Sequence, residues 1–160
     1  MRAMRHLSRA FKRFMPLVTY DEFFGRITYQ RMKNGKSYWE CSRVFAPSGE
    51  SIQLSVDAPG DAQRPDEKQR ELYSWVERNW DATFTRAEPL LRSQFEESKG
   101  EPLLEPVASV FKAGGFSIPR QGDTVPEWEM DFETKADAYQ LYSVEMLGAE
   151  ARSIVAESTC

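Results

Sequence analysis

The segment EWEMDFET at residues 127–134 alternates strictly between acidic and apolar side chains. The acids occupy every second position and are Glu127, Glu129, Asp131 and Glu133. The residues between them are Trp128, Met130 and Phe132. Because successive side chains of a β-strand point to opposite faces, the segment predicts a strand with one buried face and one solvated, acidic face. This pattern is typical of an antiparallel sheet that is covered on one side only.

Two earlier segments predict a hairpin. GRITYQRM and SYWECSRVF flank KNGK, whose Asn-Gly pair is a strong turn signal. A two-residue loop would place Tyr29 opposite Glu40, which mixes apolar and charged residues on one face. A three-residue loop that ends at a left-handed Gly35 places Tyr29 opposite Trp39 instead, so we expect the three-residue loop. A further turn at APSGE leads to a third strand in SIQLSVD.

The stretch after this meander predicts a long helix. Pro65 suits the first helical position, and Asp66 and Glu67 suit the first turn, near the positive end of the helix dipole. Apolar residues then recur at steps of three or four and predict one stripe that faces the sheet: Leu72, Val76, Trp80, Phe84 (or Thr83), Ala87, Leu91 and Phe95. Pro89 lies inside this pattern, so we expect a kink there or a second helix after a break near Arg86.

A second group of strands is expected after the helix, in SVFKAGGFSIPRQ, EWEMDFET and AYQLYSVEML. Gly114 and Gly115 in the first of these indicate a bulge or the close approach of another backbone. The last segment, GAEARSIVAES, predicts a short helix or a frayed end. The fold class is therefore α+β: a mainly antiparallel sheet built as β-β-β, a long helix and β-β-β, with the helix packed on one face.

A chain of 160 residues, of which 41% are hydrophobic and 29% charged, is long and apolar enough to bury a core. We expect residues 16–160 to form a single α+β domain. The cysteines are Cys41, inside an apolar pattern, and Cys160, which indicates no disulfide framework and favours a cytoplasmic location. The sequence has no run of about 18 apolar residues, so it predicts no membrane span.

Residues 1–15 form a basic leader. They contain no acidic residue and five basic ones, Arg2, Arg5, Arg9, Lys12 and Arg13. The remaining residues hold 16 basic and 25 acidic side chains, which is a net charge of −9. Such an acidic body disfavours nucleic-acid binding, because phosphate recognition requires clustered Lys and Arg.

The leader predicts an amphipathic arm, because apolar residues recur at steps of three or four between the basic ones: Met4, Leu7, Phe11 and Phe14. Several interpretations are open. The arm contacts an anionic membrane surface through its five basic residues, acts as an organellar targeting peptide, or docks its apolar stripe on the acidic body. A further alternative is that translation starts at Met15 and the leader is an extension without a function of its own.

The row of four acids in residues 127–134 is the candidate binding site. Neighbouring acids in the row are separated by twice the rise of a strand, about 6.5–7 Å. This spacing suits two carboxylates that act through a water, and in an enzyme Glu129 and Asp131 would share a pocket that raises the pKa of one of them. The sequence has no GxSxG, Walker or GxGxxG motif, and its one histidine, His6, lies in the leader. We therefore assign no catalytic residue, no metal site and no cofactor.

Four segments give the chain a resemblance to a family of uncharacterised bacterial proteins, a domain-of-unknown-function family. They are FGRITY (24–29), the helix from Pro65, WEMDFE (128–133) and YSVEM (142–146). The resemblance implies the same succession of a meander, a long helix and a second group of strands. Families of this kind often occur in bacterial toxin–immunity loci, so the resemblance implies a role of that type. It carries no functional residue over to this chain.

These observations predict a non-enzymatic protein-binding domain. In its most specific form it is an immunity-type protein whose acidic face binds a basic partner protein. The alternatives are a carboxylate-dependent enzyme and a peripheral membrane protein attached through residues 1–15. The oligomeric state is not predicted.

Overall fold

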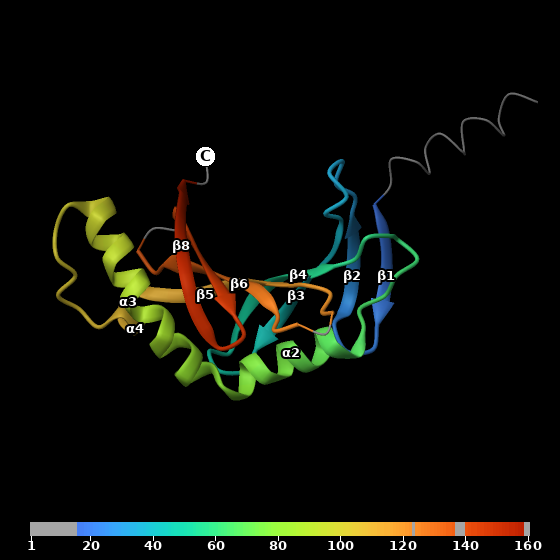
Figure 1. Ribbon diagram of the computed structural model, residues 1–160, viewed down its shortest axis with the longest axis horizontal. Coiled ribbons are helices and arrows are strands. Elements are labelled where there is room, and N and C mark those ends of the chain that lie inside the picture. The colour runs from blue at the N-terminus through green and yellow to red at the C-terminus, as the bar shows by residue number, and fades with distance from the viewer. Residues whose placement is uncertain (1–15, 123, 137–139, 159–160) are drawn as a thin grey trace, which may run out of the picture.

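The computed structural model describes residues 16–122, 124–136 and 140–158, and Figure 1 shows their arrangement. Eight strands form one sheet, in which the order in space is the order in the chain. The strands are β1 (Leu17–Asp21), β2 (Gly25–Gln30), β3 (Tyr38–Phe45), β4 (Glu50–Asp57), β5 (Phe111–Ile118), β6 (Glu127–Thr134), β7 (Gln140–Leu147) and β8 (Glu150–Ser158). The helices are α2 (Glu67–Arg78), α3 (Trp80–Lys99) and α4 (Val107–Val110). The expected α+β fold with a mainly antiparallel sheet is confirmed.

β4 and β5 form the parallel pair of the described sheet, and its other neighbouring strands pair antiparallel. Two parallel neighbours cannot be joined by a tight turn, because after the first strand the chain must return to the end of the sheet at which that strand began. Residues 58–110 make this crossover and contain α2, α3 and α4. The sheet therefore consists of two antiparallel halves, β1–β4 and β5–β8, that are joined at one parallel pair.

Gly115 permits the close approach of the two halves. It lies in register with Gln53 of β4, and a Cβ at position 115 would lie 2.5 Å from the Gln53 carbonyl oxygen. On its other side, the register between β5 and β6 shifts between Ala113 and Gly115. Both features expected of the Gly-Gly pair, a bulge and a close backbone approach, are therefore confirmed.

Gln69 connects the start of α2 to the ends of both parallel strands. Asp66 caps the helix: its carboxylate accepts a 2.9 Å hydrogen bond from the Gln69 N–H, and the Asp66 N–H donates a 3.0 Å bond to Gln69 Oε1. The Gln69 Nε2 donates to the carbonyl oxygens of Asp57 (2.9 Å) and Ile118 (3.3 Å). The side chain is fully buried, so these bonds replace water for its amide group. The expectation that Pro65 is the first helical residue is wrong, since it precedes the cap.

The helical segment breaks at Asn79, and the expected break near Arg86 is wrong. The Trp75 carbonyl accepts two bonds from Asn79, one from its side chain at 2.8 Å and one from its backbone N–H at 3.0 Å. Pro89 lies inside α3 without ending it. Proline has no backbone N–H, so the Thr85 carbonyl lacks the hydrogen-bond donor that it would have in a regular helix. Pro89 and Thr85 are both exposed, so water can donate to that carbonyl instead.

The two helices cover one face of the sheet. Trp80, the first residue of α3, contacts three sheet aromatics, with ring centroids 4.9, 6.0 and 6.1 Å from those of Phe45, Phe116 and Phe132. Tyr73 of α2 contacts Phe116 at 6.5 Å. Figure 1 shows α2 and α3 along the same side of the strands. We call the opposite side the open face; its central residues are Ser55, Ser117, Asp131, Ser143, Glu129 and Glu145.

The sequence did not predict the two outermost strands. The tail GAEARSIVAES was expected to form a short helix or a frayed end, and this is wrong: it forms β8, paired with β7. A turn at Gly148, with φ of 58°, reverses the chain, and Ile154 and Ala156 pack against the core. β1 precedes a turn in which the Asp21 carboxylate accepts from the N–H groups of Phe23 (2.9 Å) and Phe24 (2.8 Å).

The register expected for the first hairpin is confirmed, because Tyr29 lies opposite Trp39 and Gly35 has a φ of 77°. The expected three-residue loop is wrong: the strands are separated by residues 31–37. The Ser37 hydroxyl accepts a 2.9 Å hydrogen bond from the Met32 N–H. This side-chain bond replaces the next backbone hydrogen bond between the two strands. Expectations for residues 1–15 and Cys160 concern positions outside the described residues.

Gly115→Ala is expected to lower the free energy of unfolding by about 1–3 kcal/mol, because the added methyl group must displace the Gln53 backbone. The matched control is Gly60→Ala, since no heavy atom lies within 4 Å of a Cβ placed there. Its expected effect is within about 0.5 kcal/mol. Urea unfolding followed by tryptophan fluorescence measures both. Equal stabilities for the two variants would contradict the close approach at Gly115.

Gln69→Met keeps most of the buried volume but removes the hydrogen bonds at the parallel pair. The Asp57 and Ile118 carbonyls then lose a buried donor, so the free energy of unfolding should fall by about 2–4 kcal/mol. Gln94→Met on α3 is the control, because Gln94 is half-buried and takes no part in these bonds. A loss for Gln69→Met no larger than that for Gln94→Met, in the same urea experiment, would show that these bonds add nothing.

Candidate functional site

The alternation in β6 divides its side chains between the two faces as expected. Trp128, Met130 and Phe132 are buried on the helix side, with exposed fractions of 4%, 0% and 0%. The four acids of the strand point to the open face, where the paired residues of β5 and β7 also lie. The acidic row therefore belongs to the uncovered side of the sheet, and its environment depends on its neighbours there.

Glu129 has a second carboxylate directly across the ladder. It pairs with Ser117 of β5 on one side and with Glu145 of β7 on the other. Directly opposed residues on antiparallel strands have Cβ atoms about 4.5–5.5 Å apart, so like charges at these positions repel. Glu145 in turn pairs with Ser153 of β8, whose hydroxyl donates a short hydrogen bond to Glu145 Oε2.

Asp131 is held by a serine in the same way. It pairs with Ser143 of β7, whose hydroxyl donates a 2.6 Å hydrogen bond to Asp131 Oδ1. Glu157 of β8 adds a further negative charge that acts on both Glu129 and Asp131. We call Glu129, Asp131, Glu145 and Glu157 the acidic cluster.

The other two acids of the row are placed differently. Glu133 lies opposite Lys112 of β5, and the Lys112 Nζ is 3.6 Å from Glu133 Oε2, so its charge is partly balanced. Glu127 is exposed at the start of β6, opposite Leu147. Two acids from other strands therefore add negative charge near Glu129 and Asp131, whereas Glu133 differs from them in having a basic partner.

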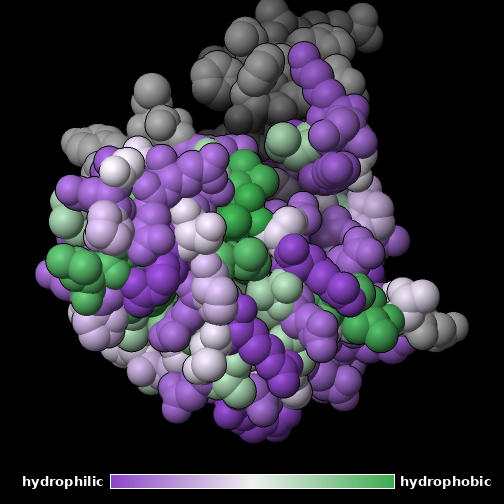
Figure 2. All heavy atoms as spheres, turned by 60° about the vertical axis from the view of Figure 1, so that its left-hand side comes forward, coloured by the Kyte–Doolittle hydropathy of each residue, from purple (hydrophilic) through white to green (hydrophobic). Residues whose placement is uncertain are grey.

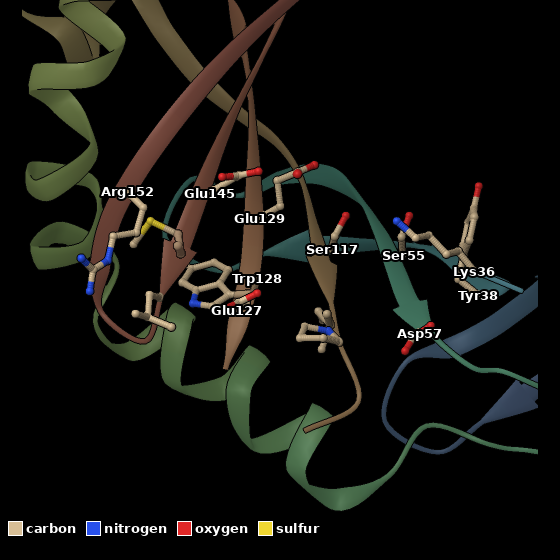
Figure 3. Close-up of a pocket in the computed structure, with 14 residues that line it drawn as sticks. Lys36, Tyr38, Ser55, Asp57, Ser117, Glu127, Trp128, Glu129, Glu145 and Arg152 are labelled. Atoms are coloured by element: carbon tan, nitrogen blue, oxygen red, sulfur yellow. The ribbon is translucent and has the colours of Figure 1, made fainter. Parts of the chain in front are cut away.

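A groove of about 830 Å³ crosses the open face beside the acidic cluster. Its lining comes from strands β3 to β8 and from the loop before β3, and includes Tyr38, Ser55, Ser117, Glu127, Glu129 and Glu145. In Figure 3, Glu129 and Glu145 lie side by side, Lys36 and Tyr38 are at one end of the groove, and Arg152 is at the other. Asp131 is not among the lining residues, so this groove is not a pocket shared by Glu129 and Asp131, as the enzyme hypothesis requires.

Two carboxylates of the acidic cluster, Glu129 and Asp131, have a raised pKa and so hold their protons more tightly than free carboxylates do. Burial raises the pKa of Glu129 above its usual value, and the charges of Asp131, Glu145 and Glu157 raise it further. Burial also raises the pKa of Asp131; the Ser143 hydrogen bond opposes this shift and the Glu157 charge adds to it. The cause is common to both groups: each is partly removed from water and lies among like charges.

No ion pair within the described part of the chain reaches a carboxylate of the acidic cluster. The described ion pairs of the open face are limited to Lys112 with Glu133, and the other ones lie along the helices and loops. Lys36 and Arg152 line the ends of the groove but form none of these pairs. The groove thus has negative charge at its centre that nothing in the described residues neutralises.

The arrangement has the chemistry of a cation-binding surface. Carboxylates accept hydrogen bonds and form their strongest ones with guanidinium and ammonium groups. Among the described residues, no group of three or more His, Cys, Asp and Glu has the geometry to hold a metal ion. The Cys41 thiol is buried, and burial raises its pKa to about 11, so it is not an activated nucleophile.

The sequence reasoning missed Glu145 and Glu157. Glu145 alternates with Val144 and Met146 in YSVEM, so its orientation could have been read from the sequence, but a single acid carried no signal of a site. Glu157 lies in the segment that was not expected to be a strand. The register of β6 and β7 places Glu145 opposite Glu129, and the pairing of β8 with β7 adds Glu157 to the same face.

The surface around α3 and β8 is mostly hydrophilic, and its hydrophobic residues form separate patches (Figure 2). Comparisons of the chain with protein-family models, curated proteins and solved structures found no match. The resemblance seen in the four sequence segments stays a prediction. Within the described residues, no helix combines the length and apolarity needed to cross a membrane.

Glu129→Gln is expected to stabilise the protein at about pH 7 and to leave it unchanged at about pH 3. A raised pKa means that the folded protein binds this proton more tightly than the unfolded chain. Stability therefore falls as the pH rises from the usual carboxyl pKa through the raised value, and the neutral amide avoids this loss. Thermal unfolding at both pH values measures the effect. Glu71→Gln, on the exposed side of α2, is the control, and an equal response of both variants would contradict the shift at Glu129.

Proposed function

We propose that the protein is a binding protein whose open face receives a positively charged segment of a partner protein. The acidic cluster carries this proposal, because two of its carboxylates, Glu129 and Glu145, line the groove, and none of the four forms an ion pair within the described residues. An immunity-type protein that covers a basic surface of a toxin is the specific form that the sequence resemblance suggests.

The electrostatics of the acidic cluster favour a cationic ligand. Burial and mutual repulsion raise the free energy of the ionised cluster when it is unoccupied, as the raised pKa values of Glu129 and Asp131 indicate. An arginine or lysine side chain would remove the repulsion and supply hydrogen-bond donors. Ser143 and Ser153 each donate a hydrogen bond to one carboxylate oxygen, of Asp131 and Glu145 respectively. The other oxygens, Asp131 Oδ2 and Glu145 Oε1, accept no hydrogen bond from the described residues.

The size of the groove supports a peptide segment rather than a single ion. A volume of about 830 Å³ spread over six strands admits several side chains. Tyr38 at the end near β3 offers an aromatic surface on which a guanidinium can stack. Opposite potentials on the two partners would speed their encounter, and this effect weakens as salt increases.

A carboxylate-dependent enzyme is the second candidate function. It is favoured by one observation: Glu129, whose pKa is raised, lies opposite Glu145 at the groove. A carboxyl with a raised pKa beside a second carboxylate is a common arrangement of a general acid and its partner. In this alternative the working pair is Glu129 and Glu145, and a neutral small-molecule substrate would take the place of the basic segment.

A polyarginine peptide is the probe that tests the proposal. We expect the full chain to bind it. The double variant Glu129→Gln/Asp131→Asn lacks two of the four carboxylates of the acidic cluster, so its association rate constant at low salt should fall by up to about tenfold. Stopped-flow fluorescence measures the rate. The control, Glu71→Gln/Glu97→Gln, removes the same charge from exposed positions on the helices and should change the rate little.

The same three proteins then serve as bait for partners in a lysate. A basic protein that binds the unmodified chain and the control, is lost with the cluster variant and elutes with salt would support the proposal. Equal rates of polyarginine association for the cluster variant and the control would contradict the proposal. Hydrolysis of a neutral substrate that Glu129→Gln abolishes would favour the enzyme instead.

A further inference from the structure

We propose that residues 1–15 of this chain bind along the open face and occupy its groove when no partner is present. The leader would thus be an internal competitor of the basic segment. The competition rests on the proposed function, whereas the docking itself rests on where the leader joins the sheet, on its length, on its charge and on the side chains that the open face exposes.

The chain enters the sheet in line with the groove. Val18, the second residue of β1, belongs to a row of paired residues that crosses the open face. The row continues through Thr28, Glu40, Ser55, Ser117, Glu129 and Glu145. Its last four members line the groove. The leader therefore begins at one end of the row on which the groove lies.

The entry point is also adjacent to the groove's border. The loop at residues 31–37 follows β2, the direct neighbour of β1, and its Lys36 lines the groove. Figure 1 shows the start of β1 beside this loop. A segment that precedes Pro16 needs only to pass over β2 to reach the groove at Tyr38 of β3.

The leader is long enough to reach the acidic cluster. Five strand spacings separate β1 from β6, which is about 24 Å at about 4.8 Å each. Fifteen residues span about 22 Å as a helix, at 1.5 Å per residue, and about 50 Å when extended. An extended leader therefore brings basic residues over β6 and β7, which carry Glu129 and Glu145, whereas a helical leader ends just short of β6.

The charges are complementary. The leader carries five basic residues and no acid, whereas the other residues have a net charge of −9. In the acidic cluster Glu129 and Asp131 are half-buried, and no member of the cluster has an ion pair within the described residues. A covalently attached segment acts at high effective concentration, so even weak pairwise attractions suffice for docking.

The open face also exposes apolar side chains for which the leader has counterparts. Val18, Tyr20, Val44 and Val155 point to this face, and their exposed fractions are 40%, 75%, 64% and 50%. The leader has apolar residues at steps of three or four between its basic ones: Met4, Leu7, Phe11 and Phe14. The open face and the leader are therefore complementary in charge, and both also carry apolar side chains.

A nitroxide in the leader tests the docking on the full chain. Ser8→Cys in a Cys160→Ser background provides one accessible thiol, since Cys41 is buried and its thiol pKa is raised to about 11. We expect loss of the amide NMR signals of Ser117, Glu129 and Glu145 at about 0.01 M salt, where the screening length is about 30 Å. Those signals should return at about 1 M salt, where it is about 3 Å.

The control variant carries the same label with Arg5, Arg9, Lys12 and Arg13 changed to Gln. Its open-face amides should keep their signals at low salt, and it should bind polyarginine several-fold more tightly than the unmodified chain. Open-face signals that persist at low salt in the unmodified chain would overturn the docking, and Glu129-dependent polyarginine binding would then leave the proposed function intact. Signal loss in the unmodified chain, with no polyarginine binding by the Gln variant, would support the docking and contradict the proposed function.

Discussion

The parallel pairing of β4 with β5 determines how the rest of the molecule is arranged. Because parallel neighbours need a long crossover, residues 58–110 must pass over the sheet, and they do so as helices on one face. That face becomes the core, and the other is left without a covering helix among the described residues. Two local details make the junction possible: Gly115 admits the Gln53 carbonyl, and Gln69 bonds the last carbonyls of both strands.

The open face combines acids from strands that are neighbours in both sequence and space. Each of β6, β7 and β8 needs only its own alternation to point a carboxylate outward, but the register of β6 and β7 places Glu129 directly opposite Glu145. Raised pKa values at Glu129 and Asp131 indicate that this costs stability, which Ser143 and Ser153 reduce through hydrogen bonds. Stability that is given up at one place on a surface is commonly associated with binding at that place.

Sequence patterns predicted the features that depend on local periodicity. The alternation in β6 identified its buried and exposed faces, the Asn-Gly turn identified the Tyr29–Trp39 register, and the Gly-Gly pair identified a close approach. Features that depend on distant partners were missed. β8 is composed of small and polar residues whose strand conformation comes from pairing with β7, and the opposition of Glu129 and Glu145 follows from a register that neither segment encodes alone. The helix breaks at Asn79, where one residue leaves the helical conformation (φ −113°, ψ 23°), and periodicity does not report such a local change.

The groove spans both halves of the sheet, and this has a consequence for folding. Tyr38 and Ser55 belong to the first half, and Ser117, Glu129 and Glu145 belong to the second. Each half can assemble from hairpins with short loop closures, whereas the pairing of Gln53 with Gly115 must close a long loop and should form late. A molecule bound in the groove therefore contacts a surface that exists only after the last long-range step. It would select the completed fold and shift the folding equilibrium toward it.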